Sequence, residues 1–234
     1  MPDARLYLLS ESEFDDAFLR VIAARVTGWD FPCGHLRHAC HHYSFTGIND
    51  DDETEIRNFF LTLRAKARTL GGDEPVFLIA VRDNDRGPFS ADAGAPEAIY
   101  PSPLARVNRL RQLEFCRDSV HENDGHGPIF PCAVGISVQM IETWILLAHD
   151  PSLTEERLPI FPDKYQRTAK DHYAGQVVPP QLKNLYDTVS SNARRQKRRE
   201  FNQSIAEKAD LASVSSRSPS FAAFVSELEN LPKP

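Results

Sequence analysis

Residues 76–81 read VFLIAV, an unbroken apolar run that ends abruptly in the polar stretch Arg82-Asp83-Asn84-Asp85-Arg86-Gly87. Such a run is typical of a strand that is covered on both faces of a sheet. Residues 5–9 (RLYLL) and 129–136 (IFPCAVGI) are predicted to be strands for the same reason. These strands alternate with segments of helical periodicity. The order predicts an α/β fold whose mostly parallel sheet is flanked by helices.

Helices are predicted mainly where apolar residues recur every three or four positions. The first begins near Ser12, and the others cover residues 56–70, 103–120, 138–149 and, as a polar helix, 183–210. The Ser-rich sequence SVSSRSPS at 213–220 is predicted to be a link into a last amphipathic helix, which Ser218 caps and Pro219 opens. The C-terminal part of the chain is therefore expected to be helical.

The composition is that of an ordinary globular protein. The chain has 234 residues, a formal net charge of −6 and a pI near 5.8. This acidity argues against nonspecific coating of nucleic acid, but it leaves room for one local basic surface. No apolar run approaches the roughly 20 residues of a membrane span, and MPDARLYLL lacks a basic leader. Four cysteines make no disulfide framework, which favours a reducing cytoplasm. We therefore expect a cytoplasmic protein and, because no apolar run is long enough, one that does not insert into membranes.

The sequence divides into two regions. Residues 1–150 hold the alternating strands and helices, and an insertion rich in His and Cys, predicted to be a loop, interrupts them at about 29–50. Residues 151–234 begin with a proline-rich segment and continue as a helical, partly basic region. We therefore expect one α/β domain followed by a helical C-terminal appendage.

Carboxylates follow two of the predicted strands. Glu11 comes after the first strand, and Asp83 and Asp85 come after VFLIAV. Ligands bind at the carboxyl ends of the strands in open parallel sheets, and residues two apart in an extended segment point the same way. If the two strands are neighbours, three negative charges converge and need a cation. Such oxygen ligands suit Mg²⁺ or Mn²⁺, which would polarise a phosphodiester and help to generate the attacking hydroxide.

Glu142 lies on the apolar face of the predicted helix at 138–149. A carboxylate on such a face must be ion-paired, hydrogen-bonded or bound to a metal, because its burial alone is too costly. Two interpretations stay open. One is a salt bridge to an arginine such as Arg82, and the other is a supporting role at the metal site.

The order of these residues resembles the TOPRIM domain of topoisomerases, primases and OLD-type nucleases. That domain has a strand, a Glu and a helix, and an Asp-x-Asp after a later strand, which Glu11, Asp83 and Asp85 match. Residues 11–19 read ESEFDDAFL, in which Glu11 and Asp15 fit the family's first motif. The resemblance implies a Rossmann-like TOPRIM fold and a metal-dependent nuclease. Its acidic set would be the three matching carboxylates, with Glu11 aiding proton transfer.

A further likeness narrows the family. Residues 141–150 (IETWILLAHD) are similar to the Ile-Glu-Ala-Trp-Leu-Leu-Ala-Asp stretch of small stand-alone TOPRIM proteins. These resemble RloB and its relatives, found in bacterial defence loci and often beside an ATPase gene. The likeness, which covers roughly residues 5–150, implies an antiviral or toxin-like nuclease that acts with an ATPase partner. The apolar face of residues 221–228 is one candidate docking surface, and association of several copies of the chain is left open.

A basic run lies in the predicted helix at 183–210. It contains Arg194, Arg195, Lys197, Arg198 and Arg199. These cations are predicted to contact the phosphate backbone of a DNA or RNA substrate. A solvated helix face is the other interpretation of such a run.

The insertion at 29–50 offers soft metal ligands. Six of them fall within ten residues: Cys33, His35, His38, Cys40, His41 and His42. Zinc binds Cys and His together, but the paired spacing of common zinc motifs is missing. Solvated histidines, one of them near the active site, are the favoured interpretation, and zinc binding is left open.

Other classes of function stay in competition. A non-catalytic scaffold with this fold is favoured by Ser12, which stands where the TOPRIM motif has glycine. A zinc-organised interaction module is another class. The sequence Asp83-Asn84-Asp85 before Arg-Gly also suits a simple turn. A haloacid-dehalogenase phosphatase ranks low, because that family places Asp-x-Asp after its first strand, whereas here another strand comes earlier.

Overall fold

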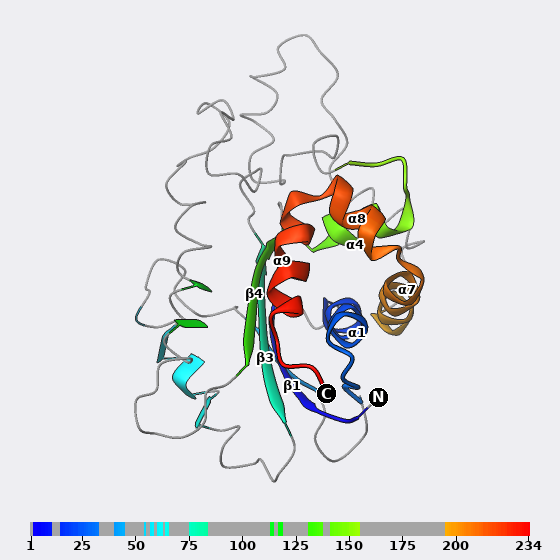
Figure 1. The fold of residues 1–234 in the computed structure, drawn as a ribbon. Coiled ribbons are helices and arrows are strands. Elements are labelled where there is room, and N and C mark those ends of the chain that lie inside the picture. The colour runs from blue at the N-terminus through cyan, green and yellow to red at the C-terminus, as the bar shows by residue number, and fades with distance from the viewer. Residues whose placement is uncertain are drawn as a thin grey trace, which may run out of the picture.

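The computed structural model describes residues 2–10, 15–32, 40–44, 54, 57–58, 60–62, 64–65, 75–83, 113–114, 117–118, 131–137, 141–154 and 195–234. A parallel sheet lies at the centre of this part of the chain (Figure 1). Its strands are β1 (Arg5–Ser10), β2 (Cys40–Ser44), β3 (Val76–Asp83) and β4 (Cys132–Ser137), in the order β2-β1-β3-β4. The predicted α/β class with a parallel sheet flanked by helices is confirmed.

The strand β2 lies inside the segment at 29–50 that the sequence predicts to be a loop. That prediction is wrong for Cys40–Ser44, which pair in parallel with Leu6–Ser10 of β1. The sequence CHHYS contains no apolar run, so periodicity does not indicate a strand there. At the edge of the described sheet, β2 is held by backbone hydrogen bonds to a single neighbour, and these do not require apolar side chains.

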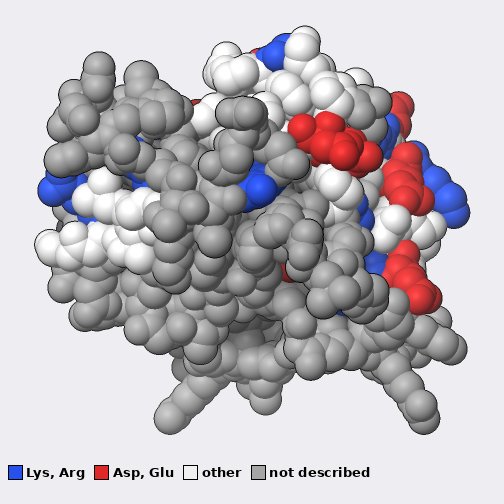
Figure 2. Space-filling view, turned by 90° about the horizontal axis from the view of Figure 1, so that it is seen from below, with Lys and Arg blue, Asp and Glu red and all other residues white. Residues whose placement is uncertain are grey.

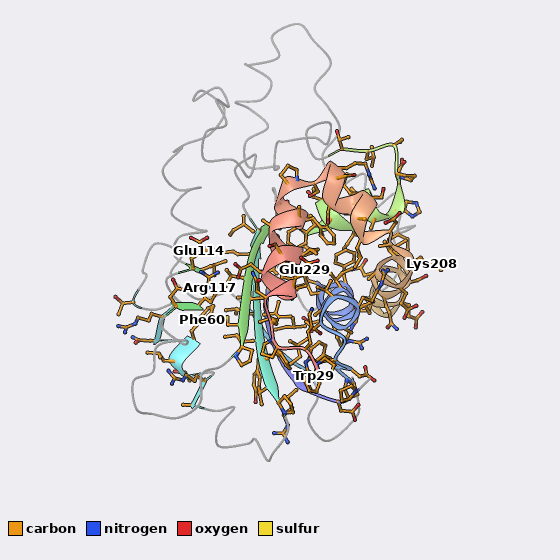
Figure 3. The ribbon with its side chains drawn as sticks, in the orientation of Figure 1. Trp29, Phe60, Glu114, Arg117, Lys208 and Glu229 are labelled. Atoms are coloured by element: carbon orange, nitrogen blue, oxygen red, sulfur yellow. The ribbon has the colours of Figure 1, made fainter. Side chains whose placement is uncertain are left out.

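Helices cover one face of the sheet (Figure 1). They are α1 (Asp15–Thr27), α4 (Glu142–His149), α7 (Arg195–Lys208), α8 (Leu211–Arg217) and α9 (Pro219–Glu229). Alternate strand residues such as Leu8, Ile79 and Ala133 join these helices in one hydrophobic core. Figure 3 places Phe60, Glu114 and Arg117 on the other side of the sheet, where Phe60 is buried.

The C-terminal helices are part of the main hydrophobic core. Helix α7 packs on α1, and α9 packs on β4. Ala206, Phe221 and Leu228 are buried in the same core as β1 and β3. The predicted helical C-terminal region is therefore present, and it supplies cover for the sheet. The domain boundary at residue 150 stays a prediction.

Trp144 of α4 lies at the centre of the helical layer. Its ring stacks on Phe224, with centroids 5.2 Å apart and planes at 14°, and meets Phe221 edge-on. Its Nε1 donates a hydrogen bond to Ser220 Oγ at 2.8 Å, which satisfies the polar atom of a fully buried ring. Trp144 is therefore a residue of the hydrophobic core.

Gly135 of β4 allows α9 to approach the sheet closely. A Cβ atom at this position would lie 2.8 Å from Cδ2 of Phe224. Contacts as short as this do not occur in folded proteins without rearrangement, so the ring of Phe224 occupies space that only glycine leaves open. Phe224 is thereby held between β4 on one side and Trp144 on the other.

Helix α9 begins as its sequence predicts. Ser218 caps it by accepting a hydrogen bond from Phe221 N at 3.2 Å, and Pro219 is its first residue. Its apolar face, however, is not a free surface, because Phe221, Phe224 and Leu228 are all fully buried. The docking surface that the sequence suggests at 221–228 is therefore part of the protein's own core.

Glu227 of α9 reaches the outer edge of β4. Both of its carboxylate oxygens accept hydrogen bonds from Arg117 Nη1, at 2.7 and 2.8 Å, and Oε2 lies 3.5 Å from Val134 N. Burial lowers the pKa of Arg117, but its hydrogen bonds to Glu227 and Asp118 outweigh this and raise it. The ion pair joins α9 to the segment on the other side of the sheet.

Helix α8 occupies most of the segment predicted to be a Ser-rich link. That prediction is wrong for residues 213–217, because α8 runs from Leu211 to Arg217. Asp210 caps the helix by accepting a hydrogen bond from Ser213 N at 3.1 Å, and Val214 is buried in the core. The cap and the buried valine outweigh the weak helix propensity of the serines.

Arg217, the last residue of α8, joins this helix to the carboxyl end of α4. Its guanidinium donates hydrogen bonds to the carbonyl oxygens of Leu147, Asp150 and Leu153 at 2.7, 3.1 and 2.6 Å. The last carbonyl groups of a helix lack partners within it, and a cation there interacts favourably with the helix dipole. Arg217 therefore caps α4 from another helix.

Replacement of Arg217 by methionine should lower the free energy of unfolding by about 2–3 kcal/mol, because it removes several charged hydrogen bonds but keeps an apolar stem. Urea denaturation followed by circular dichroism measures the change. Lys233→Met is the matched control, since the exposed Lys233 donates one hydrogen bond, to Val26 O. Its loss should cost at most about 0.5 kcal/mol. Equal effects of the two variants would contradict the capping role.

Candidate functional site

The carboxyl ends of the parallel strands meet at one edge of the sheet. There β1 ends at Ser10, β3 at Asp83 and β4 at Ser137. Strands β1 and β3 are hydrogen-bonded neighbours, with Leu9 opposite Ala80. Glu11 directly follows Ser10 in the sequence. The two strands that precede the predicted acidic residues are therefore adjacent, which is the condition for those carboxylates to converge.

Asp83 is the predicted site residue that the structure describes in most detail. It is half-buried at the end of β3, and its Oδ1 accepts hydrogen bonds from Ser137 Oγ at 2.8 Å and from Ile141 N at 2.9 Å. Ser137 is its cross-strand partner in β4, and Ile141 directly precedes α4. Asp83 therefore connects the ends of two strands to the start of a helix.

The surroundings of Asp83 orient its carboxylate. Two donors, Ser137 Oγ and Ile141 N, converge on one of its oxygens. The start of α4 adds the positive end of a helix dipole. Because both donors come from the β4–α4 connection, the carboxylate is fixed relative to the edge of the sheet.

Glu142 is the first residue of α4 and follows Ile141 directly, so it lies close to Asp83 in the fold. The five residues after it are buried, from Thr143 to Leu147, but Glu142 is half-buried. Its position at the start of the helix suits a negative charge. A supporting role at a metal site stays a prediction.

Two further carboxylates begin α1. Asp15 and Asp16 are 4% and 6% exposed. Residues 11–14 alone separate Asp15 from the end of β1, so the start of α1 lies near the same edge of the sheet. The sequence motif includes Asp15 but gives no role to Asp16. The sequence signal that could have identified Asp16 is a pair of acidic residues in the first turn of a helix that directly follows a strand.

Several predicted site residues lie outside the described residues. These are Glu11, Asp85 and Arg194, together with Cys33, His35 and His38 of the insertion. Cys40, His41 and His42 form part of β2, and their strand position is all that is described. Within the described residues no group of three or more His, Cys, Asp or Glu could hold a metal ion. The convergence of the acidic set and the zinc site both stay predictions.

The basic run begins α7. Arg195, Lys197, Arg198 and Arg199 belong to this helix, and Arg199 is half-buried. The other end of α7 is fixed to α1 by a hydrogen bond from Arg25 Nη1 to Ala206 O at 2.6 Å. Figure 2 shows acidic and basic side chains of the described residues close together on one side of the molecule. A role of the run in substrate binding stays a prediction.

An open pocket of about 550 Å³ lies between α1, α8 and α9. Its lining includes apolar residues such as Val26, Leu211 and Val225, and the charged residues Arg25 and Glu229. Helix α9 contributes Ala222, Val225, Ser226 and Glu229, which lie beside its buried residues. The part of the chain that the structure describes contains no helix long and apolar enough to cross a membrane.

Comparisons with family models, curated proteins and solved structures give no match for this chain.

Proposed function

We propose that this protein is a divalent-metal-dependent nuclease that hydrolyses phosphodiester bonds of DNA or RNA. One observation supports this most strongly. A fixed carboxylate, Asp83, ends a strand whose hydrogen-bonded neighbour is followed directly by Glu11. This is the edge at which parallel sheets bind their ligands, and the order of the residues resembles the acidic motifs of TOPRIM nucleases.

The donor chemistry at this edge fits a hard cation. Mg²⁺ and Mn²⁺ prefer carboxylate oxygens, and Asp83 presents a carboxylate whose orientation is fixed by two donors. Glu11, Asp83 and Asp85 would hold the ion, with Glu142 in support. A bound cation would polarise the scissile phosphate and lower the pKa of a water molecule. Glu11 would take up a proton from that water.

The substrate would be held by the basic run at the start of α7. Arg194, Arg195, Lys197, Arg198 and Arg199 would contact phosphates, which contribute most of the sequence-independent affinity for nucleic acid. Such binding weakens as salt rises, because counterions are released. The finer family assignment, a TOPRIM fold like that of RloB and its relatives, is also part of this proposal. So are a cytoplasmic, antiviral role and an ATPase partner.

Purified protein should cut at least one member of a panel of plasmid, linear duplex, single-stranded DNA and total tRNA when Mg²⁺ or Mn²⁺ is present. Chelation with EDTA should abolish cleavage, and added Mn²⁺ should restore it. Gel electrophoresis of the four substrates measures both effects and separates DNA from RNA. A Glu11→Gln variant is the control for contaminating nucleases. Cleavage by that variant at the wild-type rate would contradict the assignment of the site.

A non-catalytic scaffold is the second candidate. The observation that favours it is that Ser137 Oγ and Ile141 N, which flank the β4–α4 connection, donate hydrogen bonds to Asp83 Oδ1. They explain an aspartate at this position by the stability of the β4–α4 connection alone. The two candidates differ in divalent-metal binding, which the nuclease requires and the scaffold does not.

A further inference from the structure

Ser137 contacts the carboxylate on which the proposed metal site depends. It ends β4, is fully buried, and lies opposite Asp83 in the register of the two strands. Its Oγ is 2.8 Å from Asp83 Oδ1 and 3.5 Å from Arg82 O. A hydroxyl group has a single proton to donate, so the shorter contact with the anion takes it.

We propose that Ser137 is a positioning residue of the divalent-metal site, which orients the carboxylate of Asp83 for the cation. This inference rests on the proposed function and assigns a role to a residue that the acidic motifs do not contain. Ser137 does not touch the metal in this arrangement. It acts through Asp83.

The geometry explains why such a donor matters. The backbone N–H of Ile141 and the hydroxyl of Ser137 both donate to Oδ1 of Asp83. An oxygen of a carboxylate offers two lone pairs, so it can accept both of these hydrogen bonds. The hydroxyl of Ser137 restricts rotation of the Asp83 carboxylate about its Cβ–Cγ bond more than the amide of Ile141 does by itself.

Ser137 is 0% exposed, so water cannot readily take the place of its hydroxyl group. Removal of the hydroxyl therefore leaves one hydrogen-bond donor fewer at the Asp83 carboxylate. Groups that orient metal ligands commonly change metal affinity by about 10–100-fold when they are mutated. Ser137 also packs where two strands end, so a purely structural role must be separated from this one.

The test is a titration of the full chain with Mn²⁺ alone, followed by electron paramagnetic resonance of the free ion. Ser137→Ala should weaken Mn²⁺ binding about 10-fold. Ser137→Cys keeps a similar size but only a weak donor, so its affinity should lie between those of Ser137→Ala and wild type. The cysteine variant also reports on the proposal if the alanine variant fails to fold.

Ser220→Ala is the matched control. Ser220 is another fully buried serine, and its Oγ accepts a hydrogen bond from Trp144 Nε1 at 2.8 Å, within the helical layer. Its loss should lower the stability of the fold without a change in Mn²⁺ affinity. An equal loss of affinity in Ser220→Ala and Ser137→Ala would show a general structural effect and overturn the inference.

An Asp83→Asn variant separates failure of this inference from failure of the proposed function. If it loses Mn²⁺ binding while both Ser137 variants bind as wild type does, the metal site stands and the role of Ser137 is overturned. If wild type does not bind Mn²⁺, or if Asp83→Asn binds it unchanged, the metal site itself is overturned, and the inference with it.

Discussion

An Asp83→Asn variant should fold like the wild-type protein and lose metal-dependent cleavage by roughly 10²–10³-fold. The amide oxygen of asparagine can still accept the hydrogen bonds from Ser137 Oγ and Ile141 N, so the β4–α4 connection should persist. The negative charge that would hold the cation is lost. A bound cation contributes several kcal/mol of transition-state stabilisation, and about 1.4 kcal/mol corresponds to a factor of ten in rate. Cleavage rates on the preferred substrate measure the loss.

Asp150→Asn is the matched control for this experiment. Asp150 follows α4 at its opposite end, and hydrogen bonds from the hydroxyl and the amide of Ser152 lower its pKa. It is therefore a charged aspartate beside the same helix but away from the sheet edge. Its variant should cleave at the wild-type rate. An Asp83→Asn protein that is folded and fully active would exclude Asp83 as a metal ligand and favour the scaffold.

Replacement of Trp144 by alanine should lower the free energy of unfolding by about 3–5 kcal/mol. The indole fills the centre of the helical layer, stacks on Phe224 and makes a buried hydrogen bond to Ser220. Its removal opens a large cavity under α9, and Gly135 has no side chain that could fill it. Urea denaturation followed by circular dichroism measures the change without relying on tryptophan fluorescence.

Trp29 provides the comparison for Trp144, because it is the other of the two tryptophans in the chain. It is half-buried, and its Nε1 also donates a hydrogen bond, to Pro232 O at 2.9 Å. Trp29→Ala should cost only about 1–2 kcal/mol, since this ring is only partly buried. If the two variants were equally destabilised, packing at Trp144 would not be the main source of stability in this layer.

The fold could be predicted from the sequence where a single physical signal dominated. The run VFLIAV predicts β3, in which the five apolar residues from Phe77 to Val81 are buried, as expected of a strand covered on both faces. Ser218 and Pro219 predict the start of α9 through local backbone chemistry. Strand β2 and helix α8 were not predicted, since both depend on partners distant in the sequence. These are β1 for β2, and α4, through Arg217, for α8.

The candidate site likewise contains residues that the sequence could identify and others that it could not. Asp83 could be identified because a carboxylate directly after a buried strand is visible in the sequence. Its partners could not, because Ser137 faces it only in the observed register of β3 and β4. Ile141 reaches it through its backbone, which carries no sequence signal. The adjacency of β1 and β3 is likewise a property of the topology, and it is what brings the end of β1 beside Asp83.

The packing of α9 on β4 determines when this protein can fold during its synthesis. Strand β4 ends at Ser137, but Phe224, which fills the space beside Gly135, is made much later. A ribosome that adds about 5–20 residues per second needs roughly 4–17 s to cover that interval. Throughout it, the part of the sheet that α9 covers stays without that cover. A chaperone that shields nascent apolar surface should therefore increase the yield of this protein more than it does for proteins whose neighbouring elements pack as they emerge.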